Sequence, residues 1–251
     1  MALQGTPEFR EGWTKISQKE LDGILTKHKL FADQKQGGER AKLSMFDLSY
    51  LDMSGRNLWQ ADLTGALLCH CSLEEANFKD AILFAADMRF ANMTEANFDR
   101  ADLRGTCMAG ANMTEASLID ADMRDGVLMK SLSKGGDLAP IVHDEATAGL
   151  ERAVARGANM QGAKVSDSMI VQTDLTDCNL KNAKFIRANL SLTNLTGCNL
   201  EGADFRDADL RDANLSGSLL IDCDFRGADM RGTKFNNTDK RGARGLPIED
   251  D

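Results

Sequence analysis

The sequence has few prolines, few aromatic residues and no hydrophobic run long enough to span a membrane. Of its 251 residues, 3 are proline and 6% are aromatic, and no stretch approaches the ~18 consecutive apolar residues that a membrane span requires. The opening residues, MALQGTPEFREGW, lack the basic and then apolar order of a secretory signal. Six cysteines are too few for a disulfide scaffold in a chain this long and fit a reducing compartment. We therefore expect a cytoplasmic protein without a membrane span.

Positive charge is outnumbered by negative charge, with 30 Lys and Arg against 39 Asp and Glu. The formal net charge is −9, whereas a protein that binds nucleic acid directly needs a basic surface to neutralise phosphates. Most of the negative charge lies in the first half, because residues 41–130 carry a formal charge of −6 and residues 148–237 carry −1. The composition therefore argues against direct nucleic-acid binding.

A repeat of five residues is abundant. Every fifth residue over 43–128 is Leu, Met or Phe at all eighteen positions, and every fifth residue over 160–235 is Leu, Met, Phe, Val or Ile at all sixteen. We call these residues the pentad centres. Two residues before a centre the side chain is small in 31 of 34 pentads, the exceptions being Phe46, Leu51 and Arg56. The residue directly before the centre is Asp or Asn in 22 of 34.

A period of five excludes both common regular structures. In an α-helix each step of five rotates the side chain by about 140°, so the centres would wind around every face. In a flat strand, successive centres would alternate between opposite faces because five is odd. The chain must therefore turn a corner once per pentad, which is the property of a solenoid.

The pentads resemble those of a known family. ADLRG (101–105), ANFDR (96–100) and ADFRD (203–207) are similar to pentapeptide repeats, and the resemblance covers roughly 170 of the 251 residues. It implies an all-β fold, a right-handed quadrilateral β-helix with four pentads per coil and about 8–9 coils. Phenylalanines spaced by twenty support this coil length and predict stacked columns, Phe78 over Phe98 and Phe185 over Phe205 and Phe225.

The repeats divide the chain into five parts. These are an N-terminal segment (1–40), a first repeat block (41–130), an inserted loop or hairpin (131–147), a second repeat block (148–237) and a C-terminal tail (238–251). Within the first part a capping helix is expected over about 17–32, because Ser17 can act as the N-cap and Glu20 completes a capping box. This helix is expected to cover the first coil, since a solenoid end exposes its core. An alternative is that it binds a partner.

The insertion interrupts the repeat. Lys134-Gly135-Gly136-Asp137 between apolar stretches favours a hairpin, and the alternative is a helix over 144–156 that ends at Gly157. AGLER (148–152) and AVARG (153–157) can be degenerate pentads in the register of the second block. An excursion from a regular rod is a favoured place for specificity, so the candidate binding residues there are Lys134, Asp137, Ile141, His143 and Asp144.

Groups that could carry catalysis are sparse. None of the three histidines lies at a recognisable motif spacing from a nucleophile or carboxylate, and no phosphate-binding loop or dinucleotide fingerprint is present. Cys69-His70-Cys71 suggests metal ligation, but the repeat places Cys71 inward and the other two outward or at a corner. We therefore expect no catalytic, metal or cofactor site, and no enzyme.

Two outward strips are candidate partner-binding surfaces. An acidic strip is predicted from residues that recur at one outward position or lie beside it, namely Asp52, Glu74, Glu75, Glu95 and Glu115. An apolar patch is predicted from residues that replace polar ones outside the core, namely Tyr50, Leu67, Ile82, Phe84 and Phe90. The plain alternatives are a solvated acidic side, and a patch that is covered by the N-terminal helix or the insertion.

Two functions are therefore expected, of which the first requires least. The chain is either a general protein-interaction scaffold with an unidentified protein partner or, as the resemblance implies for some members, a partial DNA mimic. Such mimics bind type II topoisomerases such as DNA gyrase and protect them from quinolone-type poisons. A 40 Å length of duplex carries roughly 24 negative charges against a net −9 here, so mimicry would be limited to the first half. Neither a monomer nor a homodimer is favoured.

Overall fold

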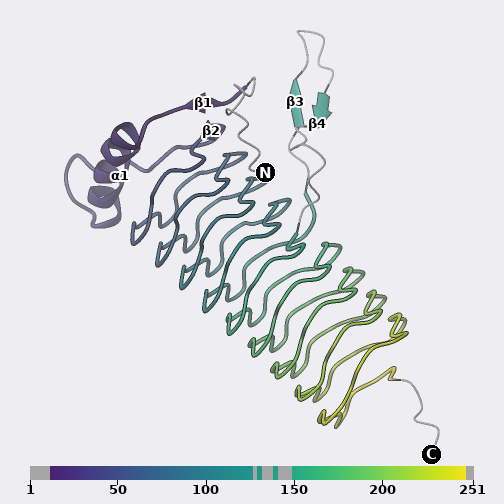
Figure 1. Cartoon of the computed structure of the whole chain (residues 1–251). Helices are drawn as coiled ribbons and strands as arrows, with labels where there is room; N and C mark the ends of the chain where they lie inside the picture. The colour runs from purple at the N-terminus through teal and green to yellow at the C-terminus, as the bar shows by residue number, and fades with distance from the viewer. Residues whose placement is uncertain (1–11, 127–128, 132–137, 141–148, 247–251) are drawn as a thin grey trace, which may run out of the picture.

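The repeats form a rod of stacked coils, which the computed structural model describes for residues 12–126, 129–131, 138–140 and 149–246 (Figure 1). One helix, α1 (Gln18–Ala32), lies at one end of the rod. The regular strands are short: β1 (Thr14–Lys15), β2 (Phe46–Asp47), β3 (Met129–Ser131) and β4 (Leu138–Pro140). Long regular strands therefore do not hold the coils together.

Single parallel bridges join each coil to the next. The residue before each pentad centre pairs with the residue twenty positions later, as Asp62 does with Ile82 and Ile82 with Asp102. The bridges form four columns of nine or ten residues, one along each side of the rod. We name the sides by the first bridging residue: side A begins at Lys42, side B at Asp47, side C at Asp52 and side D at Asn57. Four pentads thus make one coil, and about nine coils make the rod.

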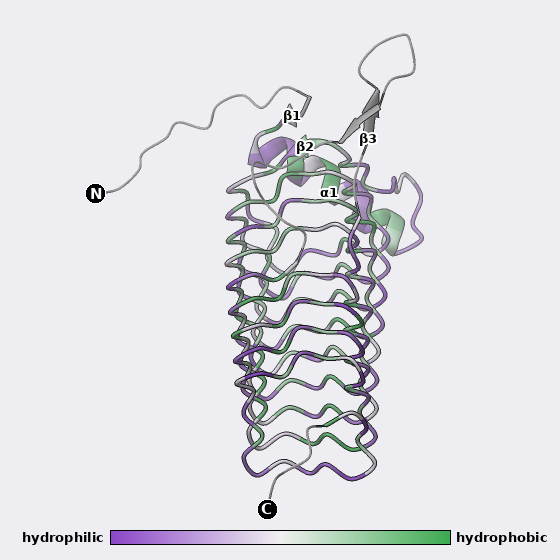
Figure 2. Cartoon of the chain, turned by 90° about the vertical axis from the view of Figure 1, so that its right-hand side faces the viewer, coloured by the Kyte–Doolittle hydropathy of each residue, from purple (hydrophilic) through white to green (hydrophobic). Residues whose placement is uncertain are grey.

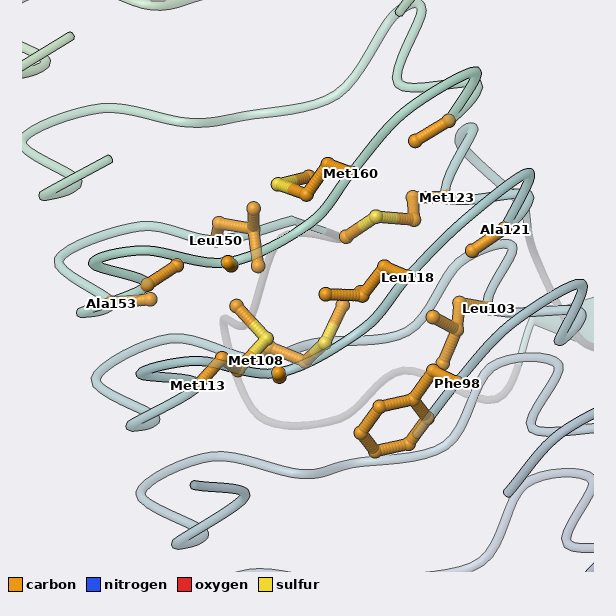
Figure 3. Packing of buried hydrophobic residues seen from close by; sticks show 14 of the residues in the cluster. Phe98, Leu103, Met108, Met113, Leu118, Ala121, Met123, Leu150, Ala153 and Met160 are labelled. Carbon is orange, nitrogen blue, oxygen red and sulfur yellow. The ribbon is translucent and has the colours of Figure 1, made fainter. Parts of the chain in front are cut away.

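The pentad centres fill the interior. Leu103, Met108, Met113 and Leu118 come from the four sides of one coil and meet inside it (Figure 3). Along each coil hydrophobic residues alternate with hydrophilic ones (Figure 2). The phenylalanine columns are confirmed, with ring centroids 4.9 Å apart for Phe78–Phe98, 4.9 Å for Phe185–Phe205 and 5.1 Å for Phe205–Phe225. Burial of the centres is therefore the main stabilising contribution.

Each side ends in a tight turn. The amide of Phe46 donates to the carbonyl of Leu43 (3.2 Å), and Leu51 donates to Leu48 in the same way (3.0 Å). The last residue of the pentad has a left-handed backbone, with φ of 58° at Met45. Gly, Asp and Asn tolerate this conformation best, and they occupy most of these corners. This turn directs the small residue of the next pentad back into the interior.

Hydroxyl and thiol groups at the small inward position are satisfied by the preceding coil. Thr106 Oγ1 donates to the carbonyl of Leu83 (3.1 Å), and Ser218 Oγ donates to that of Leu195 (2.6 Å). Cys71 Sγ contacts the carbonyl of Leu48 at the same offset of 23 residues. The five buried cysteines are free thiols. The inward polar atoms thus avoid the cost of an unpaired buried group.

Helix α1 packs on the first coil. Its Ser17 N-cap and Glu20 form the capping box that the sequence predicts, and Leu21 and Leu25 are buried in the common core. The Gln18 side chain donates to the Asp52 carbonyl and accepts from the Asp52 amide, both at 2.9 Å. On side B, β1 pairs with β2 in parallel. The backbone edge of the first coil is therefore satisfied where no earlier coil exists.

The contact with α1 also explains the three large residues at the small inward position. Phe46 and Leu51 are half-buried against the core, and Arg56 pairs with Asp22 of the helix at 2.8 Å. These residues belong to the first coil and border the N-terminal segment rather than another coil, so space is not limited there. Such exceptions are expected only at an end of a solenoid.

His28 of α1 is fully buried between the helix and the rod. Its Nδ1 accepts from the Ala41 amide at 3.0 Å. Burial lowers the pKa of His28; the Trp59 carbonyl offsets this in part and the Arg40 guanidinium reinforces it. His28 is therefore neutral in the folded chain at neutral pH.

We predict that acidification weakens the docking of α1. Because the pKa of His28 is lowered in the folded state, the unfolded state binds more protons, and stability falls as the pH drops below about 6.5. The measurement is the urea midpoint of unfolding between pH 7.5 and 5.5. His28→Asn keeps an acceptor and removes the titration, so its midpoint should fall less. The control His70→Asn, at an exposed corner, should follow the wild type; equal slopes for all three proteins would contradict the prediction.

The insertion leaves the rod between sides A and B. Cys107 pairs with Gly149 and Asp122 with Lys164, so the bridge offset is 42 residues instead of 20 there. Outside the rod, β3 and β4 pair in antiparallel fashion. The predicted boundary at 130 is wrong, because Met129 and Lys130 belong to β3 and not to a pentad. The alternative helix over 144–156 is also wrong for residues 149–156, where Leu150 and Ala155 are buried pentad centres.

The rod also continues beyond the predicted end of the second block at 237. Asp239 bridges Leu219 and Arg244 bridges Asp224, so residues 238–245 are not a separate tail. Lys240 occupies a centre position and lies over the Phe235 ring at 5.4 Å. The last coil has no following coil to bury its centres. Its centre positions therefore need not be apolar, which is why the repeat pattern did not identify it.

Candidate interaction surface

The predicted acidic residues lie on side C and at the corner that follows it. Glu75, Glu95 and Glu115 occupy left-handed corners with φ of 55°, 57° and 58°, on coils joined through the bridges Ser72–Asn92 and Asn92–Asn112. All three are exposed, as are Asp52 and Glu74 on the same side. We call Glu75, Glu95 and Glu115 the acidic column. The five carboxylates thus share one strip of the rod.

The acidic column ends at Glu115. None of its three glutamates forms an ion pair within the described parts of the chain. In the next coil the same corner is Gly157, where a Cβ would lie 2.3 Å from Glu115 Oε1. The Glu115 side chain therefore lies over a glycine, and the column cannot extend by another side chain without displacing it.

Most aspartates on sides A and B are neutralised by an arginine two residues later. Arg226 holds the pKa of Asp224 at about 2 through hydrogen bonds from its guanidinium, and Arg231 does the same for Asp229. The same pair recurs on these sides at Asp87–Arg89, Asp102–Arg104, Asp122–Arg124, Asp204–Arg206 and Asp209–Arg211, and on side D at Asp239–Arg241. Charge is therefore interspersed on these sides.

The predicted apolar patch is divided by the structure. Tyr50 and Phe90 are 69% and 56% exposed, whereas Leu67 is buried on side B and is wrong as a surface residue. Ile82 is half-buried on side A, and Phe84 is half-buried beneath the Arg104 guanidinium, 5.4 Å from the ring centroid. Only Tyr50 and Phe90 therefore share one exposed site.

His70 completes that site and was missed from sequence. The Tyr50 and His70 rings stack at 4.9 Å with 9° between their planes, and His70 and Phe90 stack at 5.1 Å and 15°. Phe90 in turn lies over Gly110, where a Cβ would be 2.5 Å from the ring. The spacing of twenty between the three residues was the available signal. We call Tyr50, His70 and Phe90 the aromatic column; it occupies the corner between sides B and C.

The Cys69-His70-Cys71 segment does not form a metal site. Cys71 is buried, and burial raises the pKa of its thiol to about 12, so that it remains protonated. His70 stacks in the aromatic column instead. No group of three His, Cys, Asp or Glu side chains that could hold a metal occurs in the described ranges. The candidate loop residues Lys134, Asp137, Ile141, His143 and Asp144 lie outside the described residues.

One open depression of about 430 Å³ borders sides D and A. It is lined by residues of both charges, namely Arg100, Asp102, Arg104, Asp120, Asp122 and Lys164. Two of its arginines already form ion pairs, Arg100 with Asp80 and Arg104 with Asp102, at 2.8 and 2.7 Å.

Among the described helices, none is long and apolar enough to cross a membrane.

Comparison with known proteins identifies the repeats. The family model for pentapeptide repeats matches 8 copies over residues 61–99, 96–131, 173–212 and 208–243. No curated protein sequence matches the chain.

Several solved structures match the chain over much of its length. HetL, a pentapeptide repeat protein involved in heterocyst differentiation regulation from Nostoc sp. strain PCC 7120, is 27% identical, with 81% of this chain and 82% of HetL covered and a TM-score of 0.35. QnrB1, a plasmid-mediated fluoroquinolone resistance protein, is 21% identical, with 78% and 84% covered and a TM-score of 0.39. Rfr23 from Cyanothece 51142 is 26% identical, with 54% and 88% covered and a TM-score of 0.25. With scores this low, the assignment rests on the repeats themselves.

Proposed function

This chain belongs to the pentapeptide-repeat family, and from that premise we propose that it is a non-enzymatic scaffold for protein–protein interaction. The rod would hold binding groups at a fixed spacing, and the partner would bind through the outward strips and through the insertion at 131–147. We further propose a right-handed sense for the coils and a capping role for α1.

One observation supports this proposal most. In the described rod, two exposed aromatic rings, Tyr50 and Phe90, and a row of three glutamates without an ion pair flank the same side of the first half. A surface kept only for solvation has no need of large exposed rings, which carry a hydrophobic cost in water. Like charges in a row beside exposed rings favour a localised partner site.

The scaffold is tested by site-specific photo-crosslinking in the host cell. We expect a photoreactive residue at position 90 or 95 to give one discrete protein adduct, and the same residue at position 222, an exposed corner of the second half, to give none. The captured protein is then purified and its affinity for the full chain measured. Adducts of equal yield at all three positions, or none at any, would contradict a localised interaction surface.

A second candidate function, a partial mimic of duplex DNA that binds a type II topoisomerase such as DNA gyrase, is favoured by the unpaired acidic column. Repeated carboxylates at one coil spacing supply the kind of charge row that a DNA-binding groove accepts. With a net charge of −9, the chain could replace only a short length of duplex.

We predict for this candidate that the chain inhibits gyrase supercoiling or protects the enzyme from a fluoroquinolone. The triple variant Glu75→Lys, Glu95→Lys, Glu115→Lys should lose the effect because it reverses the charge of the acidic column. The assay is supercoiling of relaxed plasmid against increasing protein, with and without drug. A wild-type chain without effect far above the enzyme concentration would remove gyrase as the target.

A further inference from the structure

Side C of the early coils lies between two unlike columns of side chains. The aromatic column occupies the corner before side C and the acidic column the corner after it, so that Phe90 and Glu95 are separated by a single pentad. Each column runs along the rod, one residue per coil. A partner that covers side C therefore meets rings along one of its edges and carboxylates along the other.

The rings of the aromatic column occupy a costly backbone conformation. Tyr50, His70 and Phe90 have φ of 67°, 57° and 59°, a region that bulky side chains rarely adopt. Stacking between the rings offsets part of this cost. Nevertheless the rings are displayed to solvent, with Tyr50 69% and Phe90 56% exposed. Because every corner of the rod shares this backbone, it is the exposure of large rings, and not the φ values, that indicates a binding role here.

The surface between the columns is already ordered. Thr94 Oγ1 donates to Asn92 Oδ1 and Thr114 Oγ1 to Asn112 Oδ1, both at 2.7 Å. Asn112 Nδ2 reaches the previous coil and donates to Thr94 Oγ1 at 3.0 Å. Because these short side chains are fixed by one another, a partner that lies on them loses little further side-chain entropy.

We propose that side C docks a basic amphipathic helix of a partner protein, lying along the rod with one Lys or Arg per turn against the acidic column and its apolar side chains on the aromatic column. This inference rests on the proposed function as an interaction scaffold. Charge complementarity selects the basic character, because Glu75, Glu95 and Glu115 have no ion pair within the described chain. The adjacent Asp52 and Glu74 add to the negative electrostatic potential of the same side.

The spacing of the columns selects a helix. Successive rings of the aromatic column are 4.9 and 5.1 Å apart, whereas a helix advances about 5.4 Å per turn. Over two steps the mismatch is about 1 Å, which flexible Lys and Arg side chains absorb. An extended strand places side chains of one face about 6.7 Å apart, and over the same two steps it is out of register by about 3 Å.

The probe is a fluorescent 18-residue peptide of Lys, Leu and Ala with one lysine stripe and one leucine stripe, titrated with the full chain by fluorescence anisotropy. A second peptide has the same composition interrupted by prolines and cannot form the helix. Three variants are compared with wild type. The first replaces Tyr50, His70 and Phe90 by Asn, which tolerates the left-handed corner. The second carries Glu75→Gln, Glu95→Gln and Glu115→Gln. The third, the matched control, carries Asp207→Asn, Asp212→Asn and Asp222→Asn at exposed corners of the second half.

We expect the helical peptide to bind wild type and the control equally, and each column variant at least tenfold more weakly. The binding to wild type should weaken steeply with salt, and that dependence should shrink in the glutamine variant. Absence of binding to wild type, equal weakening in the control, or equal binding of the proline peptide would overturn the proposal. A photo-crosslinked partner that binds the Tyr50, His70 and Phe90 variant as tightly as wild type would refute the side C site while leaving the scaffold function intact.

Discussion

Replacing Phe205 by alanine is expected to lower the free energy of unfolding by about 3–5 kcal/mol. Phe205 is fully buried and is the middle ring of the column formed with Phe185 and Phe225, at 4.9 and 5.1 Å. The substitution leaves a cavity and removes two stacking contacts at once. Coils in a solenoid are stabilised chiefly by their nearest neighbours, so a defect in one coil also weakens the coils above and below it. Guanidinium unfolding followed by circular dichroism measures the change.

Phe90→Ala is the matched control for Phe205→Ala. It removes the same side chain from a ring that is 56% exposed, and surface substitutions of this kind change stability by about 0.5 kcal/mol. Phe205→Leu should fall between the two, since it keeps most of the buried volume. Similar losses for Phe205→Ala and Phe90→Ala would show that the interior phenylalanine column does not carry the stability assigned to it.

Gly149→Ala is the second substitution with a large expected effect, a loss of about 3 kcal/mol or more. Gly149 is where the described chain resumes after the insertion, and its φ is +134°, a region that only glycine readily occupies. An added Cβ would lie 2.1 Å from the carbonyl oxygen of Met169 in the next coil. That atom is backbone and is fixed by its own coil, so it cannot move aside. The free energy of unfolding and the protease sensitivity of the rod should both change.

Substitutions of two other glycines allow the steric contribution to this loss to be separated from the backbone contribution. Gly217 also has a positive φ of 74°, but a Cβ there meets nothing closer than 3.9 Å, so Gly217→Ala should cost about 1 kcal/mol from backbone strain alone. Gly23 lies within α1 with open space around it, and Gly23→Ala should stabilise the helix by up to about 1 kcal/mol. If Gly149→Ala costs no more than Gly217→Ala, the close approach to Met169 is not a real constraint.

The interior of the rod could be predicted because it obeys a strict rule. A side chain at a pentad centre has one environment, so the apolar pattern identified the buried residues, the phenylalanine columns and the degenerate pentads at Leu150 and Ala155. The same rule failed at its limits. Met129 and Lys130, which the pattern assigned to the first block, belong to β3 outside the rod, and Lys240 broke the pattern although it lies in the last coil.

The surface could be predicted only in part, because exposure depends on what lies across the fold. The acidic column was identified because its residues recur every twenty positions. His70 was not identified, although it has the same spacing of twenty from Tyr50 and Phe90, because the apolar pattern does not include histidine and its stacking is visible only in the fold. Leu67 has the outward position of a surface residue, but it is buried on side B. The pairing of Asp with the Arg two residues later also required side-chain geometry that the repeat does not specify.

The bridge pattern bears on how fast the chain can fold. Outside the insertion every bridge of the rod joins residues 20 apart, which is about 0.08 of the chain length, a relative contact order typical of helical bundles rather than of β-sandwiches. Only the four bridges that cross the insertion span 42 residues. Doubling a loop adds just about 0.6 kcal/mol to its closure entropy. Coils can therefore add one after another as the chain is synthesised, with a single modest barrier where the chain must return to Gly149.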